Sequence, residues 1–156
     1  MTILSGQTIR RLGIVEPLRE RYLDDNGNSC GLSIAGYDIT ADSNVDLQPG
    51  GFLLSSTCER FLMPRDVVGV VHDKSSLARK GLAVQNTILE PGWRGYLTLE
   101  LSNHSAYWIR LVVGSAIAQV VFHFLDHPAE RPYDGKYQDQ EPMPVDARRE
   151  IYQKLK

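Results

Sequence analysis

The sequence predicts a domain built mainly from β-strands, folded as a sandwich or a barrel. Short apolar runs recur at a spacing of roughly ten residues, and proline or glycine turn signals separate them. Helical periodicity is rare along the chain. The runs predicted as strands are residues 31–41, 49–57, 66–72, 81–85, 95–103, 107–114 and 116–125.

The segments outside these runs are predicted to be helices, loops and a tail. Residues 5–13 fit one short helix, with Ser5 as N-cap and Gly13 at its end. Residues 19–29 are polar and fit a loop or a hairpin tip. From Asp126 onward the chain is polar and rich in proline, which indicates a tail that crosses a surface. Residues 147–156 carry a weak signal for a second short helix.

Composition limits the class of protein. A chain of 156 residues with 42% hydrophobic and 23% charged residues fits one domain with one core. The net charge of -2 argues against a broad surface for nucleic acid, so any phosphate binding must be local. Cys30 and Cys58 form no C-x-x-C pair and suggest a reducing cytoplasmic setting. No apolar run reaches membrane-spanning length, so we expect a soluble protein that is not exported.

Three segments have residues suited to chemistry, and each also has a structural interpretation. "KSSLAR" (74–79) is either a binding loop or a polar turn between strands. "LEPGWRG" (89–95) is either part of a pocket or a Pro-Gly turn on which Trp93 packs. In "GYLTLELSN" (95–103), strand alternation places Glu100 opposite the leucines, on a face that is either a site or simply solvated.

Taken in this order, the three segments resemble the superfamily of deoxycytidine triphosphate (dCTP) deaminases and trimeric deoxyuridine triphosphatases (dUTPases). The resemblance is closer to the deaminase branch, because residues 3–17 and 131–140 resemble the N-terminus and the nucleotide-closing tail of deaminases. Residues 49–71 and 114–122 resemble strands of the family. The resemblance covers the chain from about residue 3 to 140. The chain is shorter than typical deaminases, which implies trimmed loops before Gly31 and after Ala41.

The resemblance implies a distorted β-barrel or jelly-roll fold of the dUTPase type with short helices. It implies a single domain over residues 1–156, in which the tail 126–156 closes over the nucleotide, and a homotrimer with its sites between subunits. The implied catalytic residues are Glu100 as proton shuttle, Ser75 as a water ligand and Arg79 beside the base. The implied nucleotide-binding residues are Lys74, Ser75, Ser76, Leu77, Ala78, Arg79, Glu90, Thr98, Leu99, Glu100, Tyr133, Lys136 and Gln140.

The implied reaction is hydrolytic deamination of a cytosine deoxynucleotide, with dCTP as the expected substrate. A carboxylate such as Glu100 can take a proton from water and deliver it onward. The H-x-E and P-C-x-x-C pattern of zinc deaminases is missing from this sequence, so we expect no zinc. We expect Mg²⁺ to arrive with the triphosphate, because it prefers phosphate oxygens and water.

Two departures from the family pattern keep alternatives open. The stretch between Thr87 and Glu90 is two residues shorter than in deaminases, and Glu90 stands where Asp is usual. A longer acid would misplace the hydrolytic water of a dUTPase, so Glu90 weakens that interpretation more than the deaminase one. The alternatives are a dUTP diphosphatase, a bifunctional deaminase and diphosphatase, and a nucleotide-binding trimer without turnover.

Overall fold

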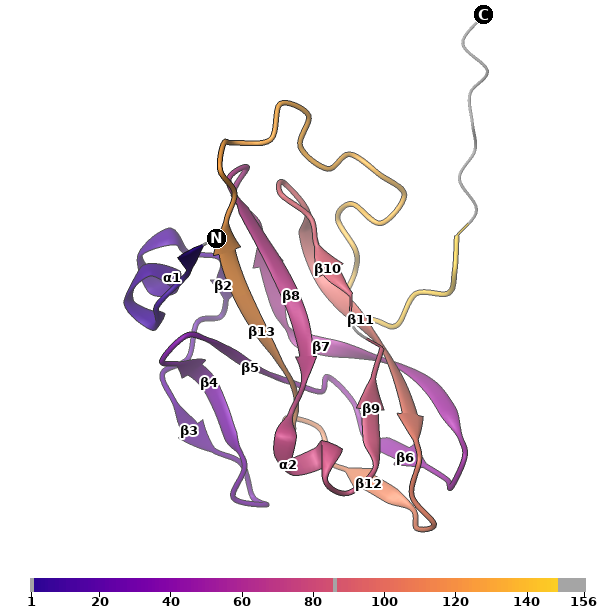
Figure 1. The fold of residues 1–156 in the computed structure, drawn as a ribbon. Helices are drawn as coiled ribbons and strands as arrows, with labels where there is room; N and C mark the ends of the chain where they lie inside the picture. Colours follow the sequence, from indigo (N-terminus) through magenta and orange to yellow (C-terminus); the bar gives the residue numbers. More distant parts are fainter. Residues whose placement is uncertain (1, 86, 149–156) are drawn as a thin grey trace, which may run out of the picture.

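The computed structural model describes residues 2–85 and 87–148, and in this part of the chain strands dominate (Figure 1). A seven-stranded sheet contains β10 (Ile88–Leu89), β8 (Val67–Asp73), β13 (Ala116–Phe124), β5 (Gly36–Thr40), β4 (Ser29–Ser33) and β3 (Tyr22–Leu23) in that order, with β1 (Thr2–Ile3) paired to β13. A four-stranded sheet has the order β2 (Val15–Glu16), β7 (Phe52–Leu62), β11 (Arg94–Asn103) and β9 (Leu82–Val84). A two-stranded sheet joins β12 (Ile109–Leu111) to β6 (Val45–Leu47). The predicted mainly-β class is confirmed.

The core lies between the two larger sheets. Alternation along β11 buries Leu97, Leu99 and Leu101 and leaves Thr98 and Glu100 partly exposed, as the sequence predicted. Phe61 on β7 and Phe122 on β13 meet in this core with ring centroids 6.4 Å apart. The buried face of β11 therefore fixes which of its side chains remain available for a site.

The predicted N-terminal helix is confirmed as α1 (Gly6–Leu12). Ser5 precedes it in an extended conformation, and Gly13 ends it with the left-handed φ of 62° that favours glycine. The segment after β8, for which a polar turn was one interpretation, contains one helical turn, α2 (Ser75–Ala78), in which Leu77 packs into the core while Ser75 and Ala78 are exposed.

Other boundaries differ from the prediction. The run 31–41 falls into two strands, β4 and β5, and Ile34 lies exposed in the turn between them. The run 107–114 forms only the short β12, whose partner β6 was not predicted. Residues 19–29 do include a hairpin tip, since β3 pairs with β4. The expected helix at 147–156 falls almost entirely outside the described residues.

Residues 126–148 form the tail, which crosses the outside of the fold and is mostly exposed, as predicted (Figure 1). Over the two described ranges, no helix has the length and apolar character that a membrane span needs. Cys30 and Cys58 are both free thiols.

Candidate active site

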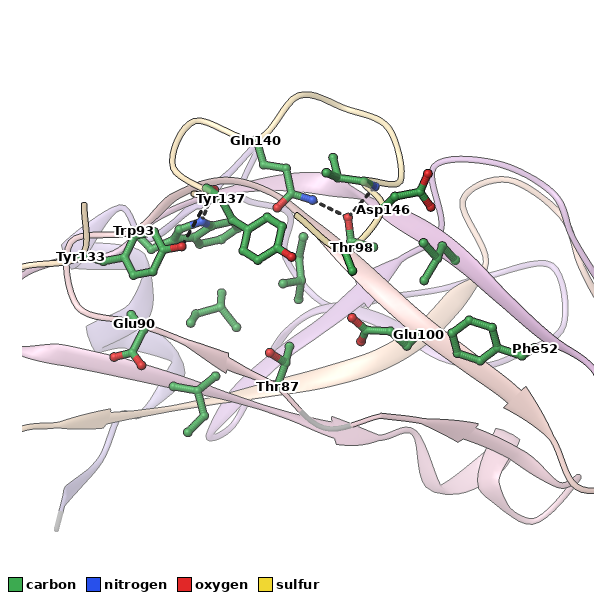
Figure 2. A pocket seen from close by; sticks show the side chains of 16 residues that line it. Phe52, Thr87, Glu90, Trp93, Thr98, Glu100, Tyr133, Tyr137, Gln140 and Asp146 are labelled. Atoms are coloured by element: carbon green, nitrogen blue, oxygen red, sulfur yellow. Dashed lines mark hydrogen bonds between the residues drawn. The ribbon is translucent and has the colours of Figure 1, made fainter. Parts of the chain in front are cut away.

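A pocket with a volume of about 490 Å³ lies between β7, β10, β11 and the tail (Figure 2). Most of its surface is apolar, with Phe52 and Leu54 of β7 and Ile88 and Leu89 of β10 among the walls. Several polar groups reach into it. They are Thr87, Glu90, Thr98, Glu100, Tyr133, Tyr137, Gln140 and Asp146. An apolar cleft with a few convergent polar groups is typical of a small-molecule site.

Glu100 lines this pocket and is partly buried. It projects from β11 on the same face as Thr98, and Phe52 of the neighbouring strand lies beside it (Figure 2). Glu90 belongs to the same pocket but lies at its other end in the same view. The two carboxylates therefore face different parts of any ligand that fills the pocket.

Thr98 is the point where the tail meets the pocket. Its hydroxyl accepts a hydrogen bond from the Gln140 side-chain amide and another, of 3.0 Å, from the Val145 backbone N–H. Its own peptide groups lie on the edge of β11 that turns away from β7. On this edge of β11, the tail residue Gln140 pairs with Gly95, and β9 pairs with residues 101–103. The edge is therefore left without a strand partner at Thr98, which leaves an opening there.

Leu99, one of the predicted nucleotide-binding residues, does not line the pocket. Its side chain is fully buried, and it pairs with Ser55 in the ladder between β11 and β7. Alternation turns its peptide groups toward β7, whereas those of Thr98 face the opening. Of the two residues, Thr98 is the one whose backbone can reach a ligand in the pocket.

The tail is attached to the start of β11 by a series of hydrogen bonds. The Trp93 indole N–H donates to the Tyr137 carbonyl (2.7 Å), and the Arg94 N–H donates to the Gln138 side-chain oxygen (2.9 Å). Arg94 also forms an ion pair with Asp139, whose carboxylate pKa is lowered by this contact. Gly95, with φ of 142°, lets the tail approach, because a Cβ there would lie 2.6 Å from the Gln140 nitrogen.

The three tail residues predicted to close over a nucleotide have different positions. Gln140 and Tyr133 line the pocket, and the Tyr133 hydroxyl accepts a hydrogen bond from the Tyr137 N–H (3.1 Å). Lys136 does not line it. Its ammonium donates to the Arg148 carbonyl (2.6 Å) and lies over the Tyr137 ring. Within one chain, Lys136 therefore contacts Arg148 and Tyr137 and does not border the pocket itself.

The predicted segment 74–79 contributes no residue to this pocket. This segment contains α2, follows the end of β8 and lies far from the tail (Figure 1). Ser75 and Ser76 line a polar cleft of about 420 Å³, while Ala78 and Arg79 line a further cleft beside Trp108. Leu77 is buried in the core and also borders the cleft beside Trp108, so its predicted nucleotide contact stays a prediction.

Lys74 is buried in an ion pair. Its ammonium lies 3.0 Å from an Asp38 carboxylate oxygen and donates to the Ser29 hydroxyl (3.0 Å), which in turn donates to Asp38 (2.9 Å). These contacts hold α2 against β4 and β5. They occupy the ammonium that was expected to bind phosphate, whereas the exposed Ser75 remains available for a ligand.

The sequence did not identify Phe52, Leu54, Ile88, Tyr137 or Asp146 as lining residues. Tyr137 lies beside the predicted Lys136, so the tail motif could have suggested it. The others have no local signal, because their role depends on β7, β10 and the tail meeting around β11.

Comparison with known proteins identifies one family. The family model described as dCTP deaminase-like matches residues 34–125. A dCTP deaminase of Azotobacter vinelandii is 34% identical, over 90% of this chain and 96% of its own length. A "dCTP deaminase, dUMP-forming" of Methanopyrus kandleri is 33% identical, over 92% and 95%.

Among solved structures, the native dUTPase of EIAV has the same fold. Its TM-score is 0.57 at 20% identity, over 79% of this chain and 97% of that one. The fold, the pocket-facing Glu100 and the match to the deaminases over nearly the whole chain agree, and the protein belongs to the dCTP deaminase-like family.

Proposed function

We propose that the protein is a dCTP deaminase that converts dCTP and water to dUTP and ammonia. The observation that carries this proposal is the position of Glu100, a carboxylate on a rigid central strand that faces an apolar pocket. Relatives that are named dCTP deaminases over nearly the full length support it. The enzyme would act in deoxynucleotide metabolism in the cytoplasm.

Glu100 has the chemistry that the reaction needs. Water adds to C4 of cytosine while N3 is protonated, and the amino group then leaves as ammonia. Glu100 takes the proton from the attacking water and passes it on, a role worth about 10²- to 10⁴-fold in rate. The opening at Thr98 offers a peptide N–H and C=O to the edge of the base, which fixes the base beside the carboxylate.

A second copy of the chain supplies the rest of the site in this proposal. Ser75 and Arg79 lie outside the pocket of their own chain. A homotrimer, in which the α2 segment of one copy meets the Glu100 pocket of the next, brings them to the substrate. Closed cyclic symmetry repeats one such heterologous contact at every interface. Arg79 then stabilises developing charge, and Ser75 holds the attacking water.

The triphosphate is bound by Ser75, Ser76 and the start of α2, with the buried Lys74 holding this segment in place. Mg²⁺ enters with the nucleotide, because phosphate oxygens and water are its preferred ligands. In the described part of the chain, no cluster of three or more His, Cys, Asp or Glu side chains could hold a metal ion.

A second candidate is a bifunctional enzyme that also releases pyrophosphate and forms dUMP. The relative from Methanopyrus kandleri that is named dUMP-forming favours this candidate. In this candidate, Glu90, at the other end of the pocket from Glu100, is the acid that orients a second water (Figure 2).

The experiment that tests the proposal incubates the protein with dCTP and with dUTP, each with Mg²⁺, and measures ammonia and pyrophosphate separately. Ammonia from dCTP without pyrophosphate identifies a deaminase. Both products from dCTP identify the bifunctional enzyme, and pyrophosphate from dUTP alone identifies a diphosphatase. Binding of either nucleotide with no product contradicts the proposal and identifies a non-catalytic binding protein.

A further inference from the structure

The ladder between β7 and β11 is interrupted just before the residues that face the pocket. Tyr96 pairs with Arg60, and Thr98 pairs with Ser56, so three residues of β7 (57–59) lie opposite Leu97 alone. A bulge of this kind leaves backbone groups without ladder partners and changes the direction of nearby side chains. The bulge therefore contributes to the direction in which Thr98 and Glu100 project.

Thr57 replaces the backbone partner that Leu97 loses at the bulge. Its hydroxyl accepts a hydrogen bond from the Leu97 N–H (3.0 Å) and donates one to the Glu59 carbonyl (2.7 Å). Thr57 is 0% exposed, so bulk water does not reach this hydrogen bond. Loss of the hydroxyl would leave a buried N–H unpaired, and β11 would shift to regain a partner.

Glu59 fastens the same bulge to the other large sheet. Its buried carboxylate accepts hydrogen bonds from the Thr40 N–H (3.0 Å) and the Thr40 hydroxyl (2.9 Å) on β5. Cys58 lies between Thr57 and Glu59 in the sequence, and its thiol donates to the Ala41 carbonyl (3.1 Å). Ala41 also forms a bridge with Thr57. The bulge is therefore held from both sides and cannot adjust freely.

We propose that Thr57 is a positioning residue for the reaction, held in place by Glu59 and Thr40. None of the three lines the pocket, so their effect passes through Leu97 to Thr98 and Glu100. This inference rests on the proposed function, since it needs Glu100 to act on a bound base. A shift of about 1 Å at a reacting group can cost about 10²-fold in rate.

The test compares Thr57→Val, which keeps the shape but loses the hydrogen bonds, with Thr57→Ser, which keeps the hydroxyl. We expect Thr57→Val to lower kcat for dCTP by at least about tenfold while KM stays within about threefold. Thr57→Ser should restore most of kcat. Ile9→Val, at a buried position of α1 that does not line the pocket, is the control for a general loss of stability.

Amide hydrogen exchange at residues 97–100 provides a readout that needs no turnover. Thr57→Val should speed exchange there more than Ile9→Val does. If the wild-type protein releases no ammonia, the proposed function fails, and this exchange alone decides whether Thr57 positions the strand. Equal exchange in the two variants, or a kcat in Thr57→Val no lower than in Ile9→Val, would overturn the inference.

If Thr57→Val does not fold, Thr40→Val and Thr40→Ser take its place. Thr40→Val removes one hydrogen bond to Glu59 and leaves the Thr57 hydroxyl intact. We expect a smaller loss of kcat in Thr40→Val, with recovery in Thr40→Ser. A Thr40→Val protein with wild-type kcat and exchange would count against the network.

Discussion

The side-chain amide of Gln140 donates a hydrogen bond to the hydroxyl of Thr98, 42 residues earlier in the chain. This contact joins the tail to the strand that carries Glu100. A parallel bridge between Gly95 and Gln140 strengthens the junction. Beyond it, Val145, Asp146 and Ala147 lie along the pocket, so a ligand and this end of the tail meet in the same space.

Closure of the tail over dCTP is the first prediction. The polar composition of residues 133–140 predicts that they become ordered only when nucleotide binds. The hydrogen bonds to Trp93 and Arg94 now lead us to expect protection of residues 137–140 with and without ligand. Residues 141–147 should gain protection when dCTP binds. Hydrogen exchange in both states measures this.

Truncation before Arg131 tests the importance of the tail separately. The shortened chain should keep its fold, because the last strand ends at Phe124, and should lose most of its turnover. A truncated protein with wild-type turnover would show that the tail is ordinary packing.

The second prediction is that Glu100→Gln keeps nucleotide binding and loses deamination. The amide has nearly the same volume but cannot accept a proton from water. We expect kcat to fall by about 10²- to 10⁴-fold, measured as ammonia release, with dCTP affinity within a few-fold of wild type. Glu16→Gln on β2, outside the pocket, is the matched control. Equal losses of binding and turnover would make Glu100 a recognition group.

The third prediction is that Arg79→Lys lowers turnover by at least about tenfold, or about 1.4 kcal/mol of transition-state stabilisation. Lysine keeps the charge but loses the planar set of donors. Lys80→Arg, a change at the next residue in the same cleft, is the control. Unchanged kinetics in Arg79→Lys would show that Arg79 is a solvated turn residue with no role in the reaction.

Mixing inactive Arg79→Ala and Glu100→Gln chains tests whether the site is shared. After the subunits exchange, an interface that takes Glu100 from one chain and Arg79 from the other regains activity. No recovery would mean that both groups act within one chain, against the trimer proposed above.

The fourth prediction concerns the buried pair of Lys74 and Asp38, whose side chains are 9% and 5% exposed. Lys74→Met should cost about 3–5 kcal/mol of unfolding free energy, because Asp38 is left buried without its partner. Denaturant unfolding measures this, with the exposed Lys80→Met as control. A stable Lys74→Met protein with weakened nucleotide binding would instead support direct phosphate contact.

The fifth prediction concerns pH. Burial raises the pKa of the Glu59 carboxyl above its ordinary value. The stability linked to this group is therefore fully present below the unfolded pKa of about 4.3 and is lost as pH rises through the folded pKa. Glu59→Gln can keep both hydrogen bonds to Thr40, so its unfolding free energy should lack this decline. Parallel pH profiles of the two proteins would contradict the prediction.

The sequence by itself determined the features that depend on local pattern. Alternation in residues 95–103 placed Leu99 inside and Glu100 on the opposite face, and Ser5 with Gly13 bounded the first helix correctly. The order of the three motifs identified the family. These features follow from side-chain period and backbone preference, which need no knowledge of distant contacts.

Only the tertiary structure decided what each polar residue contacts. The face of Glu100 is a pocket because β7, β10 and the tail surround it, and Lys74 is occupied because Asp38 lies beside it. Thr57 gained a role because the β7 ladder is interrupted opposite Leu97. Such partners come from strands far apart in the chain, so pattern alone cannot assign them: burial and hydrogen-bond satisfaction are set when the sheets pack together.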